Sequence, residues 1–307
     1  MPHAPSISVL LTSYNREEFI AEAIESVLAQ SWTDFELIVS DDRSSDRTVE
    51  IANAYAARDP RIRVSVNERN LGDYGNRRRV AGLARGRFLK YHDSDDVMYR
   101  HCLSTMFEML DAEPRAAFAL SGSGSWPGGP CPMLLTPRLA YEREFLGLGL
   151  FHQGPAAALF RTDAFKALGG FPETAYAGDY LFWLRACVTV NVLLVPGDLF
   201  YYRVHTGQEL AKPDSVKAYA DAAGEMWRML NSVQCPISGD ALELAKRNFA
   251  FSQARGIYRI FKRGRFAAAA SSLRLLGLGL GDWMTYLRPP RRRATAGTPS
   301  EVKSRLR

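Results

Sequence analysis

The chain has 307 residues, of which 47% are hydrophobic and 23% are charged. This composition excludes a wholly disordered protein, and the length suffices for one large domain or two small ones. The net charge of +6 lies in residues 288–307, where seven basic residues face one acid, while the other 287 residues are balanced. The folded part is therefore not basic, which argues against a nucleic-acid-binding surface spread over it.

The four cysteines lie far apart and match neither a zinc-binding spacing nor a dense disulfide framework, so we expect reduced thiols. Residues 1–8 contain no cationic leader, and no run of 18 apolar residues occurs anywhere in the sequence. The sequence thus predicts neither a secretory signal nor a membrane-spanning helix, and we expect a cytoplasmic protein.

Strand and helix patterns alternate through the first 120 residues. Apolar, β-branched runs predict strands at 7–11, 35–40, 61–66, 87–91 and 116–120. Between them, helices are expected from 15, 46, 75 and 101 onward, the first capped by Asn15 with Glu18 completing a capping box. Strands that alternate with helices through short links predict an α/β fold with a mostly parallel sheet flanked by helices.

The character of the sequence changes at residues 121–132, which are rich in Gly, Ser and Pro. Beyond them we expect a strand at 190–195 and helices at 218–230, 241–261 and 266–278. The predicted organisation is an α/β domain over 1–210, a helical extension over 211–287 and a basic, disordered tail over 288–307.

Polar clusters follow the predicted strands. Tyr14 comes after the first strand, Asp41 and Asp42 after the second, residues 67–70 after the third and residues 93–96 (DSDD) after the fourth. Ligands of such sheets bind beyond the carboxyl ends of the strands. Acids after two strands indicate a cation between the protein and an anionic ligand.

Four ordered segments carry a family pattern: SVLLTSYNR at 8–16, IESVLAQ at 24–30, FELIVSDDRSSD at 35–46 and DSDD at 93–96. Together they resemble the family 2 glycosyltransferases, over about residues 6–208. The resemblance implies a GT-A-type, Rossmann-like fold, with a nucleotide-binding half over about 6–120 and an acceptor half over about 133–210. It also implies an inverting enzyme that takes its sugar from a nucleotide diphosphate donor, usually with Mn²⁺ or Mg²⁺.

Asp93, Ser94 and Asp95 resemble the Asp-X-Asp motif of that family. The resemblance implies that Asp95 ligates the metal ion, that Asp93 faces the ribose or the donor sugar, and that Ser94 and Asp96 belong to the same donor site, with Asp96 touching the sugar. A hard divalent cation between carboxylate and phosphate oxygens would stabilise the leaving diphosphate. Outside this context, the same acids would be a turn and a helix cap.

Asp41 resembles the aspartate with which the family reads the base, and Thr12 and Tyr14 would line the same pocket. A carboxylate can accept the N3–H of uracil or thymine, or the N1–H of guanine, whereas neutral cytosine offers no such proton. The expected donor is therefore a UDP-, dTDP- or GDP-sugar. The alternative is that Asp41 and Asp42 form a paired cap for the helix starting at Asp46.

The segment NLGDYGNRRR at 70–79 resembles the family segment in which an arginine faces the nucleotide. Arg77 falls at that position and would bind base or phosphate through its guanidinium, with Asn70 in the same donor site. For Arg78 and Arg79 the alternative is a solvated basic helix face.

Asp179 lies where the family usually has Glu-Asp before an aromatic helix, and an inverting displacement needs one base to take the acceptor's proton. Asp179 is therefore the expected catalytic base, and a helix-capping role is compatible with it. Gly178 stands where the family has glutamate. This departure motivates an alternative function: a catalytically weak sugar-nucleotide-binding or scaffold protein of the same fold.

His205, in the run YRVH at 202–205, resembles a segment that folds over the pyrophosphate. The resemblance implies that His205 ligates the metal or contacts the leaving phosphate, with Arg203 beside it.

The expected partners are a nucleotide-sugar donor and a glycan or lipid-linked acceptor of polysaccharide or glycoconjugate biosynthesis, with no nucleic acid. The C-terminal helices and the Arg-rich tail could also contact the cytoplasmic membrane face. Packing of these helices against the α/β domain is the favoured alternative, because the glycines at 277, 279 and 281 weaken a long amphipathic helix. The sequence gives no oligomeric state.

Overall fold

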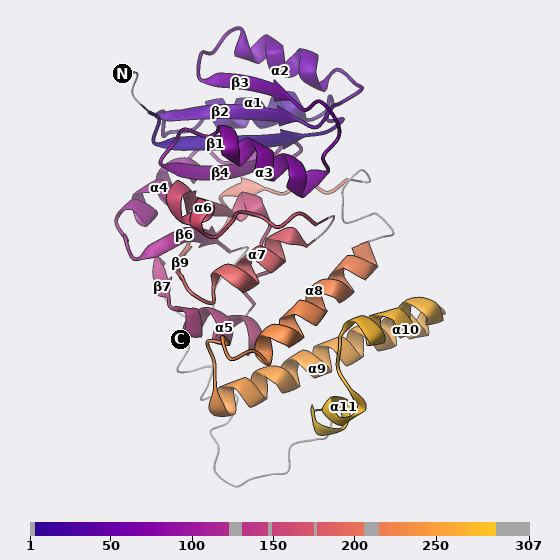
Figure 1. Ribbon diagram of the computed structural model, residues 1–307. Helices are drawn as coiled ribbons and strands as arrows, with labels where there is room; N and C mark the ends of the chain where they lie inside the picture. Colours follow the sequence, from indigo (N-terminus) through magenta and orange to yellow (C-terminus); the bar gives the residue numbers. More distant parts are fainter. Residues whose placement is uncertain (1–3, 123–130, 147–148, 175–176, 206–214, 287–307) are drawn as a thin grey trace.

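The structure is a computed structural model that describes residues 4–122, 131–146, 149–174, 177–205 and 215–286 (Figure 1). The predicted disorder of the tail at 288–307 lies outside these residues. A central sheet with helices on both faces forms the body, and four further helices extend from one end of it.

The sheet has eight strands in the order β3-β2-β1-β4-β8-β6-β9-β7. Their bounds are β1 (Ile7–Ser13), β2 (Phe35–Asp41), β3 (Ile62–Val66), β4 (Phe88–Asp93), β6 (Ala116–Ser121), β7 (Met133–Leu135), β8 (Ala158–Arg161) and β9 (Asn191–Val195). The pairs among β1 to β4 are parallel, as is β6 with β9, whereas β8 runs antiparallel to both β4 and β6, and β7 runs antiparallel to β9. The predicted mostly parallel sheet is confirmed.

All six predicted strands are present, and four of them run one or two residues further than the apolar runs. Thr12 and Ser13, for example, still pair in register with Ser40 and Asp41 although their side chains are polar. β1 and β2 are buried along their whole length, which is why they have continuous apolar runs. The extra residues carry polar side chains to the edge where a ligand can meet them.

In the part of the chain that the structure describes, the helices around the sheet are α1 (Ile20–Leu28), α2 (Thr48–Ala56), α3 (Asp73–Leu83), α4 (Cys102–Asp111), α5 (Pro137–Phe145), α6 (Thr162–Ala167) and α7 (Gly178–Ala186). The predicted cap of the first helix is wrong. Asn15 has a left-handed backbone (φ 50°), and its side-chain oxygen accepts the N–H of Ser45 (2.8 Å) instead. Helix α1 begins later, after Phe19, whose side chain cannot cap it.

The core has one half on each face of the sheet. One half includes α1 and α4, and the other includes α3, α5, α6 and α7. In the second half, aromatic rings pack on one another, and the Trp183 indole stacks on the Phe160 ring with a 5.6 Å centroid separation. Since Trp183 and Phe182 belong to α7, this aromatic cluster fixes the helix whose first turn carries Asp179.

The C-terminal helices are α8 (Ser215–Leu230), α9 (Gly239–Lys262), α10 (Phe266–Leu275) and α11 (Leu280–Tyr286). They adjoin the body through α5 and α7, and the Trp227 ring of α8 stacks on the Phe249 ring of α9 at 5.8 Å. The far end of α9 and the start of α10 point away from the sheet (Figure 1). Within the described ranges, every helix is too short or too polar to cross a bilayer.

A buried carboxylate joins the amino ends of the first strands. Glu36 of β2 accepts hydrogen bonds from the Ser8 hydroxyl (2.6 Å), from the backbone and guanidinium of Arg85 (2.8 Å each) and from the Arg63 guanidinium (2.8 Å). Burial alone would raise the pKa of Glu36, but these bonds and the Arg63 charge lower it overall. The folded state therefore favours the ionised carboxylate.

This pKa shift makes folding stability depend on pH. Because the folded-state pKa of Glu36 is depressed, its contribution is complete above the ordinary glutamate pKa of about 4.3 and is lost as the pH falls through the folded value. Glu36→Gln should lower the free energy of unfolding by about 1.5–3 kcal/mol at pH 7. It should also flatten the loss of stability between neutral and acid pH, measured by urea denaturation at a series of pH values.

The control for Glu36→Gln is Glu50→Gln, since Glu50 is an exposed carboxylate paired with Arg47 at 2.8 Å. It should change little at any pH, because exposed pairs contribute little. An unchanged pH slope in Glu36→Gln would contradict the assignment.

Candidate active site

The polar segments that follow the strands meet at one edge of the sheet. Ser13 pairs with Asp41 on one side of β1, and Thr12 pairs with Asp93 on the other. Tyr14 continues from β1 at this edge with a half-exposed ring. The carboxyl ends of three adjacent strands thus bring together the residues expected to bind the donor.

Asp41 is buried and held by its own loop. Its carboxylate accepts the N–H and hydroxyl of Ser44 (2.7 and 2.5 Å) and the hydroxyl of Ser13 (3.1 Å). The interpretation of Asp41 and Asp42 as a paired helix cap is wrong, because the carboxylate that accepts the N–H of Thr48, the first residue of α2, belongs to Asp46 (3.0 Å). Each carboxylate oxygen can accept more than one hydrogen bond, so Asp41 retains capacity for a ligand N–H.

Asp42 organises the loop that leads into α3. Its carboxylate accepts the backbone N–H groups of Leu71 and Gly72 (2.8 and 2.9 Å) and the side-chain amide of Asn67 (2.7 Å). Asn70 donates to the Asp42 carbonyl (3.2 Å), so its side chain ties this loop to the end of β2. The expected donor residue Asn70 therefore lies beside the Asp41 loop.

The carboxyl ends of β1, β2 and β4 form the edge that we call the donor edge. Arg77 lies behind it, with its guanidinium almost completely buried. Nε donates to Asp73 (2.9 Å) and Nη2 donates to Asp93 (2.6 Å). Among the described residues, Nη1 has no hydrogen-bond partner. Burial would raise the pKa of Asp93, but the charge and hydrogen bond of Arg77 lower it, so Asp93 stays ionised.

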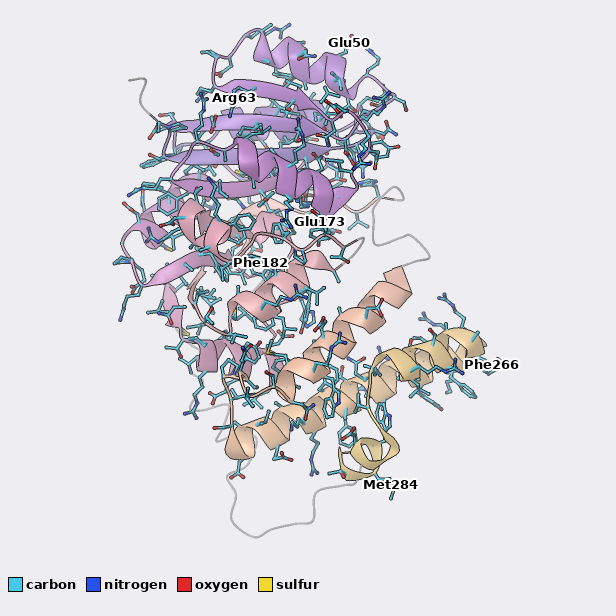
Figure 2. All side chains as sticks on the ribbon, in the orientation of Figure 1. Glu50, Arg63, Glu173, Phe182, Phe266 and Met284 are labelled. Atoms are coloured by element: carbon cyan, nitrogen blue, oxygen red, sulfur yellow. The ribbon has the colours of Figure 1, made fainter. Side chains whose placement is uncertain are left out.

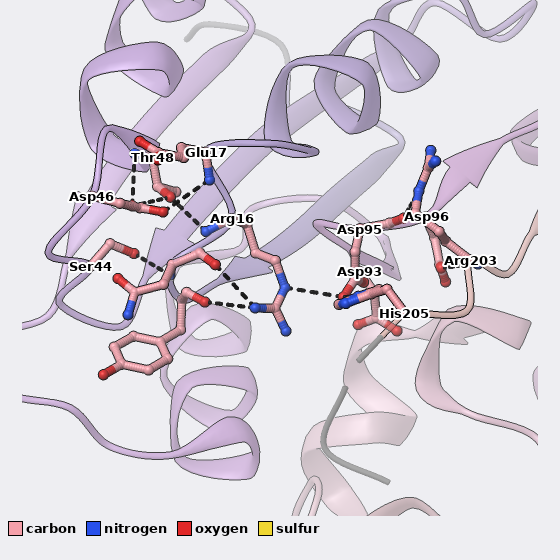
Figure 3. Close-up of polar contacts among 12 residues, drawn as sticks. Arg16, Glu17, Ser44, Asp46, Thr48, Asp93, Asp95, Asp96, Arg203 and His205 are labelled. Atoms are coloured by element: carbon pink, nitrogen blue, oxygen red, sulfur yellow. Dashed lines mark hydrogen bonds and ion pairs between the residues drawn. The ribbon is translucent and has the colours of Figure 1, made fainter. Parts of the chain in front are cut away.

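Asp95 contacts two basic side chains (Figure 3). Its Oδ2 lies 2.9 Å from Nε2 of His205 and 3.1 Å from Nε of Arg16. Arg16 also donates through Nη1 to the carbonyls of Tyr14 and Asn15 (3.1 Å each). Sequence reasoning gave Arg16 no role, although it closes the SVLLTSYNR segment and its place in that segment was the available signal.

His205 reaches Asp95 because a small second sheet folds its segment back. Strand β10 (Phe200–Tyr201) pairs antiparallel with β5 (Val97–Met98), which directly follows the acidic segment 93–96. The His205 ring also lies 5.0 Å from the ring of Phe19, between centroids.

Asp96 ties the same two segments together. Its Oδ1 accepts the backbone N–H of Arg203 (3.0 Å), while Arg203 donates through Nε to the Asp95 carbonyl (2.8 Å) and pairs with Glu22 (2.5 Å). Burial, with the negative charges of Asp93 and Asp95, raises the pKa of Asp96 to about 8. Asp96 and Ser94 are both buried. The structure shows Asp96 in contact with the Arg203 backbone, and its contact with a sugar stays a prediction.

The distance between Asp95 Oδ2 and His205 Nε2 shows whether the two side chains could bind one metal ion. Two neighbouring ligands of an octahedral Mg²⁺ ion, each at about 2.1 Å, lie about 3 Å apart, which matches the 2.9 Å between Oδ2 and Nε2. Within the described ranges, no group of three or more His, Cys, Asp or Glu side chains could hold a metal ion by itself. The residues present therefore fit an ion whose remaining ligands are phosphate oxygens and water, and Arg16 shares the oxygen that would bind it.

Asp179 lies at the start of α7, across from α3. Its backbone N–H donates to the Tyr74 hydroxyl (3.0 Å), and its own Oδ1 accepts the N–H of Tyr180 (2.8 Å). Burial raises the pKa of Asp179, against the opposing effects of the Tyr180 N–H, the Tyr74 hydroxyl and the positive charge of Arg77. The carboxylate is thus a stronger base than an exposed aspartate.

The family model described as Glycosyl transferase family 2 matches residues 8–169, which is more than half of the chain. The chain belongs to this family. The match covers the whole donor edge up to the acidic segment 93–96, and it ends before Asp179 and His205.

Curated relatives agree with this membership. Poly(ribitol-phosphate) beta-N-acetylglucosaminyltransferase TarS of Staphylococcus aureus (strain MW2) is 28% identical over 261 residues, which cover 81% of this chain and 45% of TarS. GalNAc(5)-diNAcBac-PP-undecaprenol beta-1,3-glucosyltransferase of Campylobacter jejuni is 34% identical over 105 residues, 34% of either chain. The chain spans less than half the length of these relatives.

Solved structures show the same fold. TarS 1-349 of S. aureus in complex with UDP-GlcNAc superposes with a TM-score of 0.62 at 21% identity, covering 92% of this chain and 78% of that one. The mannosyltransferase PcManGT of Pyrobaculum calidifontis, in complex with GDP-Man and Mn²⁺, gives 0.57 at 17% identity, covering 93% and 84%. The GT-A fold expected from the family 2 motifs is confirmed.

The surroundings of Gly178 leave no room for a side chain. A Cβ at Gly178 would come within 2.7–2.8 Å of ring atoms of Tyr74, closer than real side-chain contacts allow. The Tyr74 ring therefore fills the space into which a larger residue at 178 would project. Burial and the charges of Asp179 and Asp73 raise the pKa of the Tyr74 phenol, which stays neutral beside Asp179.

Gly178→Ala should therefore displace Tyr74 or the start of α7. We expect a loss of about 1–3 kcal/mol in the free energy of unfolding, measured by urea denaturation, because the added methyl group overpacks a buried contact. The same substitution combined with Tyr74→Ala should cost much less than in the wild-type background.

The control for Gly178→Ala is Gly82→Ala in α3, where an added Cβ meets nothing within 4 Å. That variant should be unchanged or more stable by up to about 1 kcal/mol, since alanine is the better helix former. Equal effects of Gly178→Ala with and without Tyr74 would sink the steric explanation.

Proposed function

We propose that the protein is an inverting glycosyltransferase that moves one sugar from a UDP-, dTDP- or GDP-sugar to a hydroxyl of a glycan or lipid-linked acceptor. Its biosynthetic product would be a polysaccharide or glycoconjugate. The proposal rests on one arrangement of carboxylates. Asp41, Asp93 and Asp95 lie at the donor edge, and α3 connects this edge to Asp179, whose pKa is raised above that of an exposed aspartate. Membership of family 2 supports it.

The nucleoside would bind at the ends of β1 and β2. Asp41, held in place by Ser13 and Ser44, would accept an imide N–H of the base. Thr12 lies at the same edge, and the half-exposed ring of Tyr14 offers an aromatic face to the nucleoside. The solved complexes of TarS with UDP-GlcNAc and of PcManGT with GDP-Man support a uridine or guanosine donor.

Asp95 and His205 would hold a Mn²⁺ or Mg²⁺ ion together with the donor diphosphate. When bound, such an ion supplies positive charge that stabilises the departing nucleoside diphosphate. The ion would compete with Arg16 for the Asp95 oxygen, and a guanidinium released from that contact would be available for phosphate oxygens. Asp93 keeps its negative charge through Arg77 and would orient the ribose or the donor sugar by accepting hydroxyl hydrogen bonds.

Asp179 would act on the acceptor. An inverting displacement requires the acceptor oxygen to approach opposite the leaving diphosphate, and its proton must pass to a base on that side. The carboxylate of Asp179 would take this proton, and its raised pKa brings its proton affinity closer to what the transfer needs. The Tyr74 hydroxyl, bonded to the Asp179 backbone, would fix the position of this carboxylate.

A second candidate follows from Gly178. A family member without the usual glutamate beside its base could bind the sugar nucleotide and have little or no turnover, acting as a scaffold. Donor binding with no transfer or hydrolysis on any acceptor pool would favour this candidate.

We further propose that the protein works in the cytoplasm, at the membrane face where lipid-linked acceptors are available. The undecaprenol-linked acceptor in the name of the C. jejuni relative supports this. The basic residues of the 288–307 segment would add electrostatic attraction to anionic lipid.

Two substitutions separate donor binding from chemistry. Asp95→Asn should weaken nucleotide-sugar binding in Mn²⁺ and abolish turnover, whereas Asp179→Asn should keep donor affinity and lower turnover by about 100-fold or more. Donor affinity is measured calorimetrically, and turnover by the nucleoside diphosphate released from a panel of nucleotide sugars with Mn²⁺.

The matched control is Asp163→Asn. Asp163 also lies in the first turn of a helix and accepts the N–H of the next residue at 2.8 Å, but it belongs to α6. It should leave turnover unchanged. Full activity in Asp179→Asn would refute its assignment as the base.

The proposed base also predicts a pH dependence. Turnover requires ionised Asp179, so kcat/KM should fall as the pH drops through its pKa, which lies above the usual value of about 4. Tyr74→Phe removes a hydroxyl that lowers the pKa of Asp179. The acid limb of the kcat/KM profile should therefore move to higher pH. Arg77 from α3 and the N–H of Tyr180 remain as the other groups facing Asp179.

Tyr141→Phe is the control for Tyr74→Phe, because the Tyr141 hydroxyl is likewise buried and bonded to backbone, the Leu184 carbonyl (2.5 Å). It should leave the acid limb of the kcat/KM profile in place. An acid limb that stays fixed in Tyr74→Phe would show that this hydroxyl has only a structural role.

A further inference from the structure

The end of the helical extension exposes aromatic side chains that a folded core would normally bury. Tyr258 is 57% exposed, Phe261 53% and Phe266 59%. Figure 2 shows Phe266 at one end of the helical extension, where α9 passes into α10, away from the sheet. We call this region the α9–α10 tip, and it comprises Phe251, Arg255, Tyr258, Arg259, Phe261, Lys262, Arg263, Arg265 and Phe266.

The tip has an ordered amphipathic arrangement. Residues 251, 255, 258 and 262 recur at helical spacing and form one exposed face of α9, in which Phe and Tyr alternate with Arg and Lys. The Lys262 ammonium lies 5.4 Å from the Tyr258 ring centroid. The Phe261 and Phe266 rings meet edge to face at 5.0 Å, so both remain exposed side by side.

The charge of the tip has one sign. Residues 244–281 contain eight Lys or Arg and no Asp or Glu, and five of these cations lie between residues 255 and 265. In the part of the chain that the structure describes, none of these five forms an ion pair with an acid. The tip is therefore a cationic surface with apolar rings at its centre.

The combination of cations and exposed aromatic rings indicates which partner could bind the tip. The 288–307 segment of the chain is itself basic, and a second copy would bring the same cations, so like charge opposes both. A nucleic-acid duplex would satisfy the cations, but its bases are stacked inside the helix and offer little to the paired Phe261 and Phe266 rings at the extremity. An anionic bilayer satisfies both, because basic side chains are attracted to its headgroups and aromatic rings insert at the headgroup level.

We propose that the α9–α10 tip docks on anionic lipid, with Phe261 and Phe266 entering the headgroup region and the surrounding cations contacting lipid phosphates. The sequence suggests membrane contact by the C-terminal helices and the Arg-rich tail as a whole. The structure restricts the proposed surface to the α9–α10 tip, because Trp283 of α11 is half-buried and packs against the larger core cluster. The proposal deepens the proposed function and rests on it only for the lipid-linked acceptor. Donor hydrolysis in the absence of lipid tests that function separately.

The test is co-sedimentation of the full chain with phosphatidylcholine vesicles, with and without a third of phosphatidylglycerol. The wild-type chain should bind only the anionic vesicles and should be released as the salt concentration rises. The triple variant Lys262→Gln/Arg263→Gln/Arg265→Gln should reduce the partition coefficient by about 100-fold, following the effect of each cation near a charged surface. Phe261→Ser/Phe266→Ser should also weaken binding.

The matched control removes three exposed cations from other faces of the molecule: Arg58→Gln/Arg100→Gln/Lys166→Gln. It should bind anionic vesicles as the wild type does, and all variants should keep the wild-type rate of lipid-free donor hydrolysis and the wild-type circular dichroism spectrum. The proposal is overturned if both tip variants bind vesicles like the wild type, or if deletion of residues 289–307 alone abolishes binding. Preferential binding of duplex DNA over anionic vesicles would overturn it equally.

Discussion

The buried ion pair between Arg77 and Asp93 is the constraint on which the site depends. A guanidinium removed from water needs carboxylates beside it, and Arg77 has two, Asp93 at the end of β4 and Asp73 one turn earlier in α3. This pair fixes α3 against the donor edge. Tyr74, from the same turn of α3, then contacts the start of α7 and Asp179. A single helix thereby sets the separation between the donor side and the acceptor side.

Two of the three aspartates within residues 93–96, Asp93 and Asp96, have pKa values shifted in opposite directions because their surroundings differ. Asp93 has a lowered pKa because of Arg77, whereas burial and its acidic neighbours keep Asp96 largely protonated at neutral pH. Asp95, between them, contacts Arg16 and His205. The segment can therefore hold one carboxylate for a ligand and use another to fasten the Arg203 backbone, without collecting three adjacent negative charges.

Much of this arrangement could be predicted from the sequence, and the exceptions have a common cause. Apolar runs predicted the strands, and the ends of those runs predicted the positions of Asp41 and the acidic segment 93–96. Both predictions succeed because a buried strand is recognisable from consecutive residues in the sequence. The antiparallel β8 between β4 and β6, the contact of Arg16 with Asp95 and that of Tyr74 with Gly178 all join segments distant in sequence. Periodicity carries no information about such pairs. The Asn15 cap failed similarly, since the side chain found a partner in Ser45, 30 residues away.

The close approach of Tyr74 to Gly178 has a consequence for related sequences. A tyrosine at the first position and a side chain at the second cannot both keep the positions that Tyr74 and Gly178 have here, so we expect substitutions at the two positions to be coupled. Relatives that carry glutamate at the position of Gly178 should have a smaller residue at the position of Tyr74. The pair thus defines a sequence signature by which a subgroup with this acceptor-side architecture could be recognised in an alignment, although neither residue alone would distinguish it.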